Sequence, residues 1–344
     1  MPLDQLRQLI ADRPRVRLGE WPTPLVKLDR LSQQFGVEVF MKRDELSGIA
    51  LGGNKTRKME FVLADVIAKG YRDVLTEGPR PSNHTMMTAM ACLRLGLRCH
   101  CVVASEPPDF YEGNILLLRY MGVSLTFSPL DIANPDPVDN ARFRATIEHV
   151  QAETGAYSIP AGGTMPVAEP GYMNAVLEIA EQCDGDLPFD AVFIAYGTGG
   201  TSTGIVLGQA VAGFRVPVYA VAVGTRQAFE ALRDRDLAGL YEHMATELQL
   251  DIRHEWPAVE EVFGYAETGY AVPTAGGDAA IKLLASTEGY FLDPVYTAKA
   301  FDAMLDMIRT GKIAPGSRVL FVHTGGLSML PVGRYTWPGT VSND

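Results

Sequence analysis

The stretch LGGNKTRKME at residues 51–60 leads two glycines and an asparagine into a lysine that opens a predicted helix. Apolar residues then recur every three or four positions, the spacing that turns one face of a helix toward a core: Met59, Val62, Leu63, Val66 and Ile67. Lys55 would therefore lie at a helix N-terminus, where free N–H groups and the helix dipole disfavour positive charge. A larger fraction of its amine would then be neutral and nucleophilic. Taken alone, the stretch favours a blander interpretation, a phosphate-binding turn or a solvated basic helix start.

The composition fits a globular chain of two domains. It has 344 residues, and about 150 residues is a usual domain size. Apolar residues make up 47%, and the net charge of −11 disfavours nucleic acid or an anionic membrane as a partner. No apolar run approaches the ~18 residues of a membrane span, and the N-terminus lacks a signal-peptide core, so we expect a cytoplasmic protein. Four cysteines without a CxxC pair and six histidines without HExxH predict no metal site.

Strands and helices are predicted to alternate along most of the chain. Strand patterns lie at 37–41, 73–76, 98–103, 123–127, 191–196, 218–223 and 318–322, with helical patterns at 83–95, 110–121, 137–153 and 277–288. This alternation is typical of an α/β protein whose parallel sheets are covered on both faces. We expect two open, doubly wound parallel-sheet lobes that meet near the Gly/Pro-rich passage 159–171, with a ligand in the crevice between them. Residues 235–270 have no clear periodicity.

A glycine-rich octet, GTGGTSTG at Gly197–Gly204, follows an apolar strand and opens a helix. Backbone N–H groups in such a turn converge on an anion, and the helix dipole assists. The octet is neither a Walker A loop nor a GxGxxG motif. The residues expected to form the anion cup are Gly197, Thr198, Gly199, Gly200 and Thr201. The alternative is a tight turn without a ligand.

The same octet contains a rival signal for a hydrolase. Gly200 to Gly204 matches the G-x-S-x-G nucleophile elbow, and Asp293 and His323 follow in the order those enzymes use. However, Ser202 falls roughly one helical turn beyond the predicted end of the strand. We therefore keep a Ser202 hydrolase as an alternative from another class.

A second anion cup is predicted at Ser82–Asn83–His84, which starts a helix after a strand and suits a carboxylate. Tyr296, in the sequence DPVYT, lies at another helix start and offers a hydroxyl for proton transfer. Capping alone explains the first feature about half of the time, and core packing is the usual role of a lone tyrosine. Together with Lys55 and the glycine loop, however, these features describe a site for pyridoxal 5′-phosphate and an amino acid.

The chain resembles the D-cysteine desulfhydrase and 1-aminocyclopropane-1-carboxylate (ACC) deaminase family of fold type II, the tryptophan synthase β-like pyridoxal-phosphate enzymes. The resemblance runs over nearly the full length, through FMKRDE, GGNKTRKME, SNH, IPAGGT, GTGGTSTG, LDPVYT and HTGG. GGNKTRK together with DPVY is highly specific, whereas GTGGT alone is not. The resemblance implies a smaller domain at residues 50–165, a larger one at 1–49 plus 166–344, and a homodimer.

The resemblance also implies roles for individual residues. Lys55 would form the Schiff base with pyridoxal phosphate, beside Asn54, and Asn83 would bond the 3′-oxygen of the cofactor. Ser82, with the backbone of Asn83 and His84, would bind the substrate carboxylate. Tyr296 and Tyr270 would line the active site as catalytic residues.

Two threonines bear on the type of reaction. ACC deaminases of this family have Glu and Leu where this chain has Thr297 and Thr324, which desulfhydrase-like members share. A threonine hydroxyl leaves the pyridine nitrogen of the cofactor largely neutral, which suffices when the β-substituent leaves easily. We therefore predict a carbon–sulfur lyase that acts on D-cysteine and releases a 2-oxo acid, ammonia and hydrogen sulfide. The alternatives are an L-cysteate sulfo-lyase, an ACC deaminase or an inert binder of the cofactor.

Some residues depart from the family pattern. The usual QSNHxRQ is here Pro81-Ser-Asn-His84-Thr-Met86-Met87, and residues 164–170 (TMPVAEP) replace a turn rich in Gly and Ser. We expect Met165 and Pro166 to narrow or dry the substrate pocket. The cofactor assignment is unaffected by these changes, but the identity and handedness of the substrate depend on them.

Overall fold

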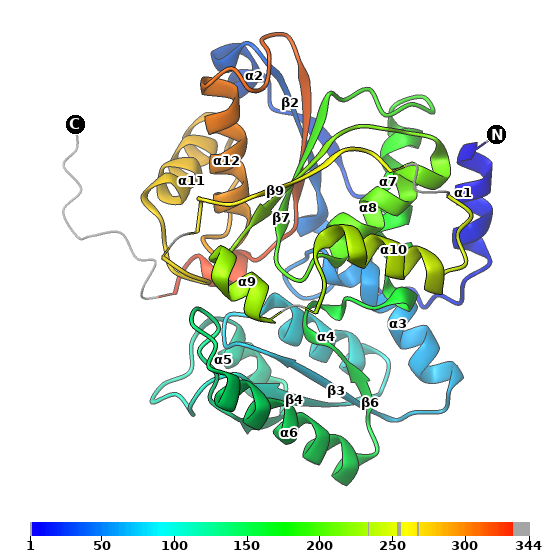
Figure 1. Ribbon diagram of the computed structural model, residues 1–344, viewed down its shortest axis with the longest axis vertical. Helices are drawn as coiled ribbons and strands as arrows, with labels where there is room; N and C mark the ends of the chain where they lie inside the picture. The colour runs from blue at the N-terminus through cyan, green and yellow to red at the C-terminus, as the bar shows by residue number, and fades with distance from the viewer. Residues whose placement is uncertain (1, 233, 253–255, 267, 333–344) are drawn as a thin grey trace.

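The computed structural model describes residues 2–332 except 233, 253–255 and 267, and two β-sheets organise these residues into two lobes (Figure 1). The larger sheet has the order β1 (Leu25–Lys27), β2 (Glu38–Arg43), β10 (Arg318–His323), β7 (Ala191–Tyr196), β8 (Val218–Ala222), β9 (Val259–Val262). Its pairs are parallel except for β1, which runs antiparallel to β2.

Helices cover both faces of the larger sheet because its central strands are apolar on both sides. In β7, Val192 and Ile194 face one core cluster, whereas Phe193 faces the other. The first cluster includes α1 (Pro2–Ala11), α7 (Pro170–Gln182), α8 (Gly200–Ala212) and α10 (Leu237–Glu247), with α9 (Arg226–Leu232) beside it. The second includes α2 (Asp29–Phe35), α11 (Ala275–Glu288) and α12 (Thr297–Arg309).

The smaller sheet is entirely parallel, in the order β5 (Ser124–Phe127), β4 (Arg98–Val103), β3 (Asp73–Gly78), β6 (Tyr157–Ile159). Helices α3 (Lys55–Ala68), α4 (Asn83–Arg94) and α5 (Gly113–Tyr120) cover one face, and α6 (Pro137–Thr154) covers the other. Four short 3-10 helices complete the described elements: η1 (Asp44–Leu46), η2 (Ala161–Gly163), η3 (Pro166–Ala168) and η4 (Leu327–Met329).

The predicted fold class is confirmed, and two predicted strands, 98–103 and 191–196, have the observed bounds of β4 and β7. Residues 235–270, where the sequence has no clear periodicity, contain α10 and β9. The sequence of β9 is VEEV, a half-exposed edge strand rather than an apolar run, which explains the missing signal. The division into domains at residues 50 and 165 stays a prediction. Within the described part of the chain, every helix is too short or too polar to cross a membrane.

Candidate active site

Loops after the carboxyl ends of four strands converge with the start of α3. They follow β3 and β6 in the smaller lobe and β7 and β10 in the larger one, and they carry most of the predicted site residues. In open α/β sheets, ligands collect at such strand ends. The two sheets therefore bring most of the predicted residues close to one another, at the strand ends where the two lobes meet.

The turn before Lys55 is packed against the end of β10. Gly53 pairs with Gly325 in an isolated bridge, and the Asn54 N–H donates to the Thr324 carbonyl at 3.0 Å. Gly52 has a φ of +71°, and a Cβ on it would lie 1.7 Å from the Glu45 carbonyl oxygen, so the turn requires glycine. These contacts fix where α3 begins.

Lys55 is the first residue of α3, and its Nζ donates to the Gly162 carbonyl at 3.1 Å. Burial, together with the ammonium group of Lys58, lowers the pKa of Lys55 well below its usual value. Lys58, one helical turn later, is fully buried, and its Nζ lies 3.3 Å from the same carbonyl. The two amines thus lie next to the same carbonyl oxygen. Their proximity and burial make the neutral form of Lys55 more favourable than it is in an exposed lysine.

The glycine octet forms the turn after β7 and the first residues of α8. The first-turn N–H groups of α8 have no acceptor within the helix, because intrahelical bonding starts one turn later. Thr198 Oγ1 lies 2.7 Å from Thr164 Oγ1, and Asn54 Nδ2 donates to Thr201 Oγ1 at 2.9 Å. This turn therefore faces the start of α3.

Three residues next to this turn, Lys58, Thr164 and Glu169, were not predicted as site residues from the sequence. A Cβ on Gly200 would lie 2.2 Å from Lys58 Nζ, 2.7 Å from Thr164 Oγ1 and 3.1 Å from Glu169 Oε1. Glu169 is fully buried, and neither of its carboxyl oxygens has a hydrogen-bond partner among the described residues. Burial raises the pKa of Glu169 to about 8, against the opposing effect of Lys58. The second lysine of KTRK was the one sequence signal for this cluster.

The second predicted cup lies at the start of α4. Ser82 is the N-cap, and its Oγ accepts from the Thr85 N–H at 3.4 Å. Asn114 Nδ2 donates to Asn83 Oδ1 at 2.8 Å, which turns the Asn83 amide nitrogen toward Gly326. His84 points away into the smaller lobe, where its Nε2 lies 2.7 Å from Thr76 Oγ1. Only the backbone of His84 is therefore available at the cup, and Asn114 is a positioning residue that the motif did not reveal.

Tyr270 and Tyr296 are brought together as expected, with their hydroxyl groups hydrogen-bonded and their rings 5.8 Å apart. Thr297 Oγ1 donates to Asp293 Oδ1 at 2.7 Å and accepts from the Asp293 N–H at 2.7 Å. Its hydroxyl is thus part of the cap of α12. Thr324 lies at the end of β10 and is 5% exposed.

The residues of the alternative hydrolase are not assembled into a triad. Ser202 Oγ donates to the Gly199 carbonyl at 2.7 Å, within the first turn of α8. Asp293 accepts from the backbone N–H groups at the start of α12, and His323 Nε2 donates to the Phe291 carbonyl at 2.8 Å. Each group is therefore engaged elsewhere, and the strand ends at Tyr196, before the elbow position.

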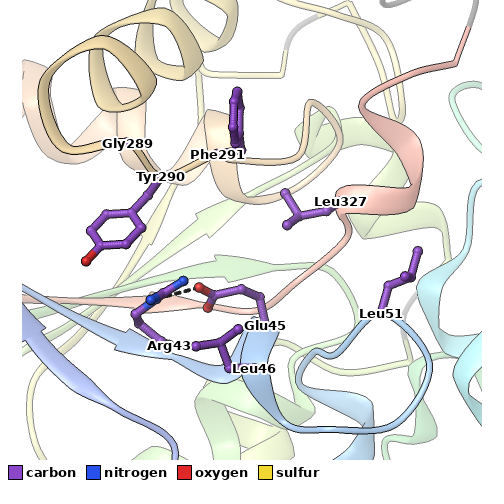
Figure 2. A pocket seen from close by; sticks show the side chains of 8 residues that line it. All are labelled: Arg43, Glu45, Leu46, Leu51, Gly289, Tyr290, Phe291 and Leu327. Carbon is purple, nitrogen blue, oxygen red and sulfur yellow. Dashed lines mark hydrogen bonds and ion pairs between the residues drawn. The ribbon is translucent and has the colours of Figure 1, made fainter.

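A pocket of about 480 Å³ lies beside this region, and Figure 2 shows the Arg43 guanidinium turned toward the Glu45 carboxylate, with Nε and Oε1 2.7 Å apart. The guanidinium carbon also lies 4.3 Å from the centre of the Tyr290 ring. The lining residues are Arg43, Glu45, Leu46, Leu51, Gly289, Tyr290, Phe291 and Leu327. None of the predicted site residues belongs to this lining, so we do not assign the chemistry to this pocket.

An amine of lowered pKa opposite an anion cup at a helix N-terminus defines a class of protein, the enzymes that hold pyridoxal phosphate on a lysine. The sequence profile of the family described as pyridoxal-phosphate dependent enzymes matches residues 16–325, and the chain belongs to this family.

Relatives resemble the chain over nearly its full length. A D-cysteine desulfhydrase of Salmonella schwarzengrund is 35% identical over 342 residues, which cover 96% of this chain and 98% of that protein. A Pyrococcus horikoshii protein named "Putative 1-aminocyclopropane-1-carboxylate deaminase" is 34% identical over 325 residues, which cover 93% of this chain and 94% of that protein. A solved structure of an ACC deaminase homologue has a TM-score of 0.80 and 33% identity, and it covers 95% of this chain and 96% of that chain.

The residues present fit pyridoxal phosphate. A Cβ at position 200 would lie 2.2 Å from Lys58 Nζ, so glycine at this position lets the Lys58 amine lie directly against the N-terminus of α8, where both favour an anion. The lysine amine, the free N–H groups and the Asn83 amide supply the nucleophile and donors that the cofactor requires.

Proposed function

We propose that this protein is a pyridoxal-phosphate-dependent lyase that removes the β-substituent of a small amino acid, with D-cysteine as the first candidate. The position of Lys55 carries the proposal: its amine, of lowered pKa, opens α3 opposite the loop that starts α8. The name of the Salmonella relative supports the same substrate.

We assign the cofactor contacts to residues of both lobes. Lys55 would hold the cofactor covalently, beside Asn54. Gly197, Thr198, Gly199, Gly200 and Thr201 would bind the phosphate, with Lys58 as an added cation. The Asn83 amide nitrogen would donate to the 3′-oxygen of the cofactor, and the hydrogen bond from Asn114 orients the amide for this. Thr324 and Thr297 would lie near the pyridine nitrogen.

We assign three tasks to residues of the site: binding the substrate carboxylate, accepting the Cα proton and protonating the leaving group. Ser82 and the N–H groups that open α4 would bind its carboxylate, because a helix N-terminus favours an anion. Bound pyridoxal phosphate supplies an electron sink for the charge left at Cα. The Lys55 amine, once displaced by the substrate amine, would accept the Cα proton. The hydrogen-bonded pair Tyr296 and Tyr270 would supply a proton to the leaving sulfur.

The threonines favour β-elimination over opening of the cyclopropane ring of ACC. Position 297 is a threonine, which has no carboxyl group to keep the pyridine nitrogen protonated, and its hydroxyl donates a hydrogen bond to Asp293. Ring opening needs a stronger electron sink than the loss of a thiolate. We therefore keep ACC deamination, which the name of the Pyrococcus relative suggests, as the second candidate.

A panel of amino acids tests the proposal. The purified enzyme is given D-cysteine, L-cysteine, L-cysteate, β-chloroalanine and ACC, and the 2-oxo acid is measured together with sulfide or sulfite. We expect pyruvate and sulfide from D-cysteine. Release of 2-oxobutanoate from ACC at a comparable rate would overturn the argument from the threonines. A yellow protein that is inactive on every substrate would indicate an inert binder.

The resemblance also leads us to propose a cytoplasmic homodimer. Sedimentation equilibrium measures the mass directly, and a single species of one chain's mass, 37.4 kDa, would contradict the dimer.

A further inference from the structure

Glu169 is a buried carboxyl group to which the proposed chemistry gives no task. It lies where η3 ends and α7 begins, directly before Pro170, in the segment TMPVAEP that departs from the family pattern. It is 0% exposed, and both of its carboxyl oxygens lack a hydrogen-bond partner among the described residues. A buried acid without a hydrogen-bond partner is costly and calls for an explanation.

The carboxyl borders the anion cup at the start of α8. The position that a Cβ on Gly200 would take lies 3.1 Å from Glu169 Oε1 and 2.2 Å from Lys58 Nζ. Because Gly200 has no side chain, both groups lie directly against the first residue of α8. The N–H groups of this helix end are the ones that would bind the cofactor phosphate if the proposed site is correct.

The polar groups around Glu169 come from three elements. Lys58 and Lys55 of α3 stabilise its anion, and the nearby Gly204 N–H of α8, which does not form a hydrogen bond with either carboxyl oxygen, does so more weakly. Tyr241 of α10 is a buried, neutral hydroxyl whose own pKa burial raises. Burial opposes the anion and brings the pKa of Glu169 to about 8. A phosphate dianion at α8 would add a like charge and take Lys58 as its counter-ion, so the carboxylate would be disfavoured further.

We propose that Glu169 is the proton-holding member of the cofactor's phosphate site. Its carboxyl group is protonated when the phosphate occupies the cup, and the O–H donates toward the phosphate. Where the free protein holds this group as a carboxylate, it takes up the proton from solvent as the phosphate binds. The inference rests on the proposed position of the phosphate. Its consequence is that pyridoxal phosphate binds less tightly as the pH rises above neutrality, because the protonated carboxyl is the form that accepts the phosphate.

Equilibrium titration of the cofactor-free full chain with pyridoxal phosphate tests this inference. Glu169→Gln keeps the shape and a donor but cannot ionise. Near pH 7 both proteins should bind equally. Near pH 9 the wild type should bind about tenfold more weakly than Glu169→Gln, the effect of one proton over about one pH unit. Pyridoxal, which has no phosphate, should bind both proteins alike. Glu181→Gln, on the exposed end of the same helix, should follow the wild type.

Proton uptake gives a second measurement that needs no variant. Calorimetry near pH 8.5 in two buffers of different ionisation enthalpy should show about half a proton or more taken up with pyridoxal phosphate beyond that with pyridoxal. Equal uptake, or identical pH profiles for wild type and Glu169→Gln, overturns the role of Glu169. Gly200→Ala tests the proposed position of the phosphate separately from the role of Glu169. Its methyl group should weaken the binding of pyridoxal phosphate but not the binding of pyridoxal. If Gly200→Ala has no such effect, the proposed position of the phosphate fails as well.

Discussion

Lys55 is the residue whose chemistry depends most on its neighbours. Burial and Lys58 lower its pKa below the usual 10.5, and only the neutral amine attacks an aldehyde. The rate of pyridoxal uptake by the cofactor-free enzyme should therefore rise with pH through this lowered pKa and level off above it. Stopped-flow absorbance from about pH 6 to pH 10 measures the profile. A rate that still rises without levelling at about pH 10 contradicts the prediction, and Lys58→Gln should move the inflection upward.

The substitution Gly200→Ala adds a single methyl group at the anion cup and therefore tests whether the phosphate binds there. A Cβ there would come within 2.2 Å of Lys58 Nζ and 2.7 Å of Thr164 Oγ1, so it would push both groups away from the N-terminus of α8, where we propose that the phosphate binds. We expect Gly200→Ala to weaken the binding of pyridoxal phosphate at least ~tenfold, which corresponds to the loss of about one charge-assisted hydrogen bond. Pyridoxal affinity should change little. A thermal melt near that of the wild type serves as the control for folding.

Helix α3 is held in place by a buried ion network behind the site. Arg57 donates to Asp44 and to Glu178 with every distance at 2.8 Å, and Lys42 Nζ lies 3.1 Å from Glu178. The network joins α3, η1, β2 and α7. It therefore fixes the helix whose first residue is Lys55.

Arg57→Met should destabilise the protein by about 3–5 kcal/mol, because the two buried carboxylates would keep their neutral hydrogen-bond donors but only Lys42 as a cation among the described residues of the network. Urea unfolding followed by circular dichroism measures the change. Arg7→Met is the matched control, since Arg7 forms exposed ion pairs, and it should leave the midpoint nearly unchanged. An equal midpoint for both variants would contradict the importance of the network.

The elements show what a sequence can and cannot predict. Apolar strands such as β7 and the helix starts at Lys55 and Asn83 follow from local patterns, so they were predictable. Glu169 and Asn114 were not, because their importance comes from contacts with segments about 31 positions or more away in the chain. Thr297 was predicted to face the cofactor, yet its hydroxyl also caps its own helix through Asp293, a contact the motif alone does not specify.

For the whole molecule, the net charge of −11 acts against the anionic ligand that the local cup attracts. Lys55 and Lys58 are buried and act at short range, whereas the surface charge acts over the Debye length, about 30 Å at 0.01 M salt and about 8 Å at 0.15 M. Added salt should therefore remove more repulsion than attraction. We expect the association rate of pyridoxal phosphate to rise roughly two- to fivefold between these salt concentrations.

Stopped-flow measurement of the association rate at several salt concentrations distinguishes the repulsion by the surface charge from the attraction by the buried lysines. Pyridoxal is the matched ligand, because it lacks the phosphate charge, and its rate should stay level. A rate for pyridoxal phosphate that falls with salt would mean that the cationic cup steers the ligand from a distance, despite the acidic surface. The affinity can still fall with salt in either case, because screening of the phosphate contacts raises the dissociation rate. The association rate is therefore the measurement that decides between long-range repulsion and local attraction.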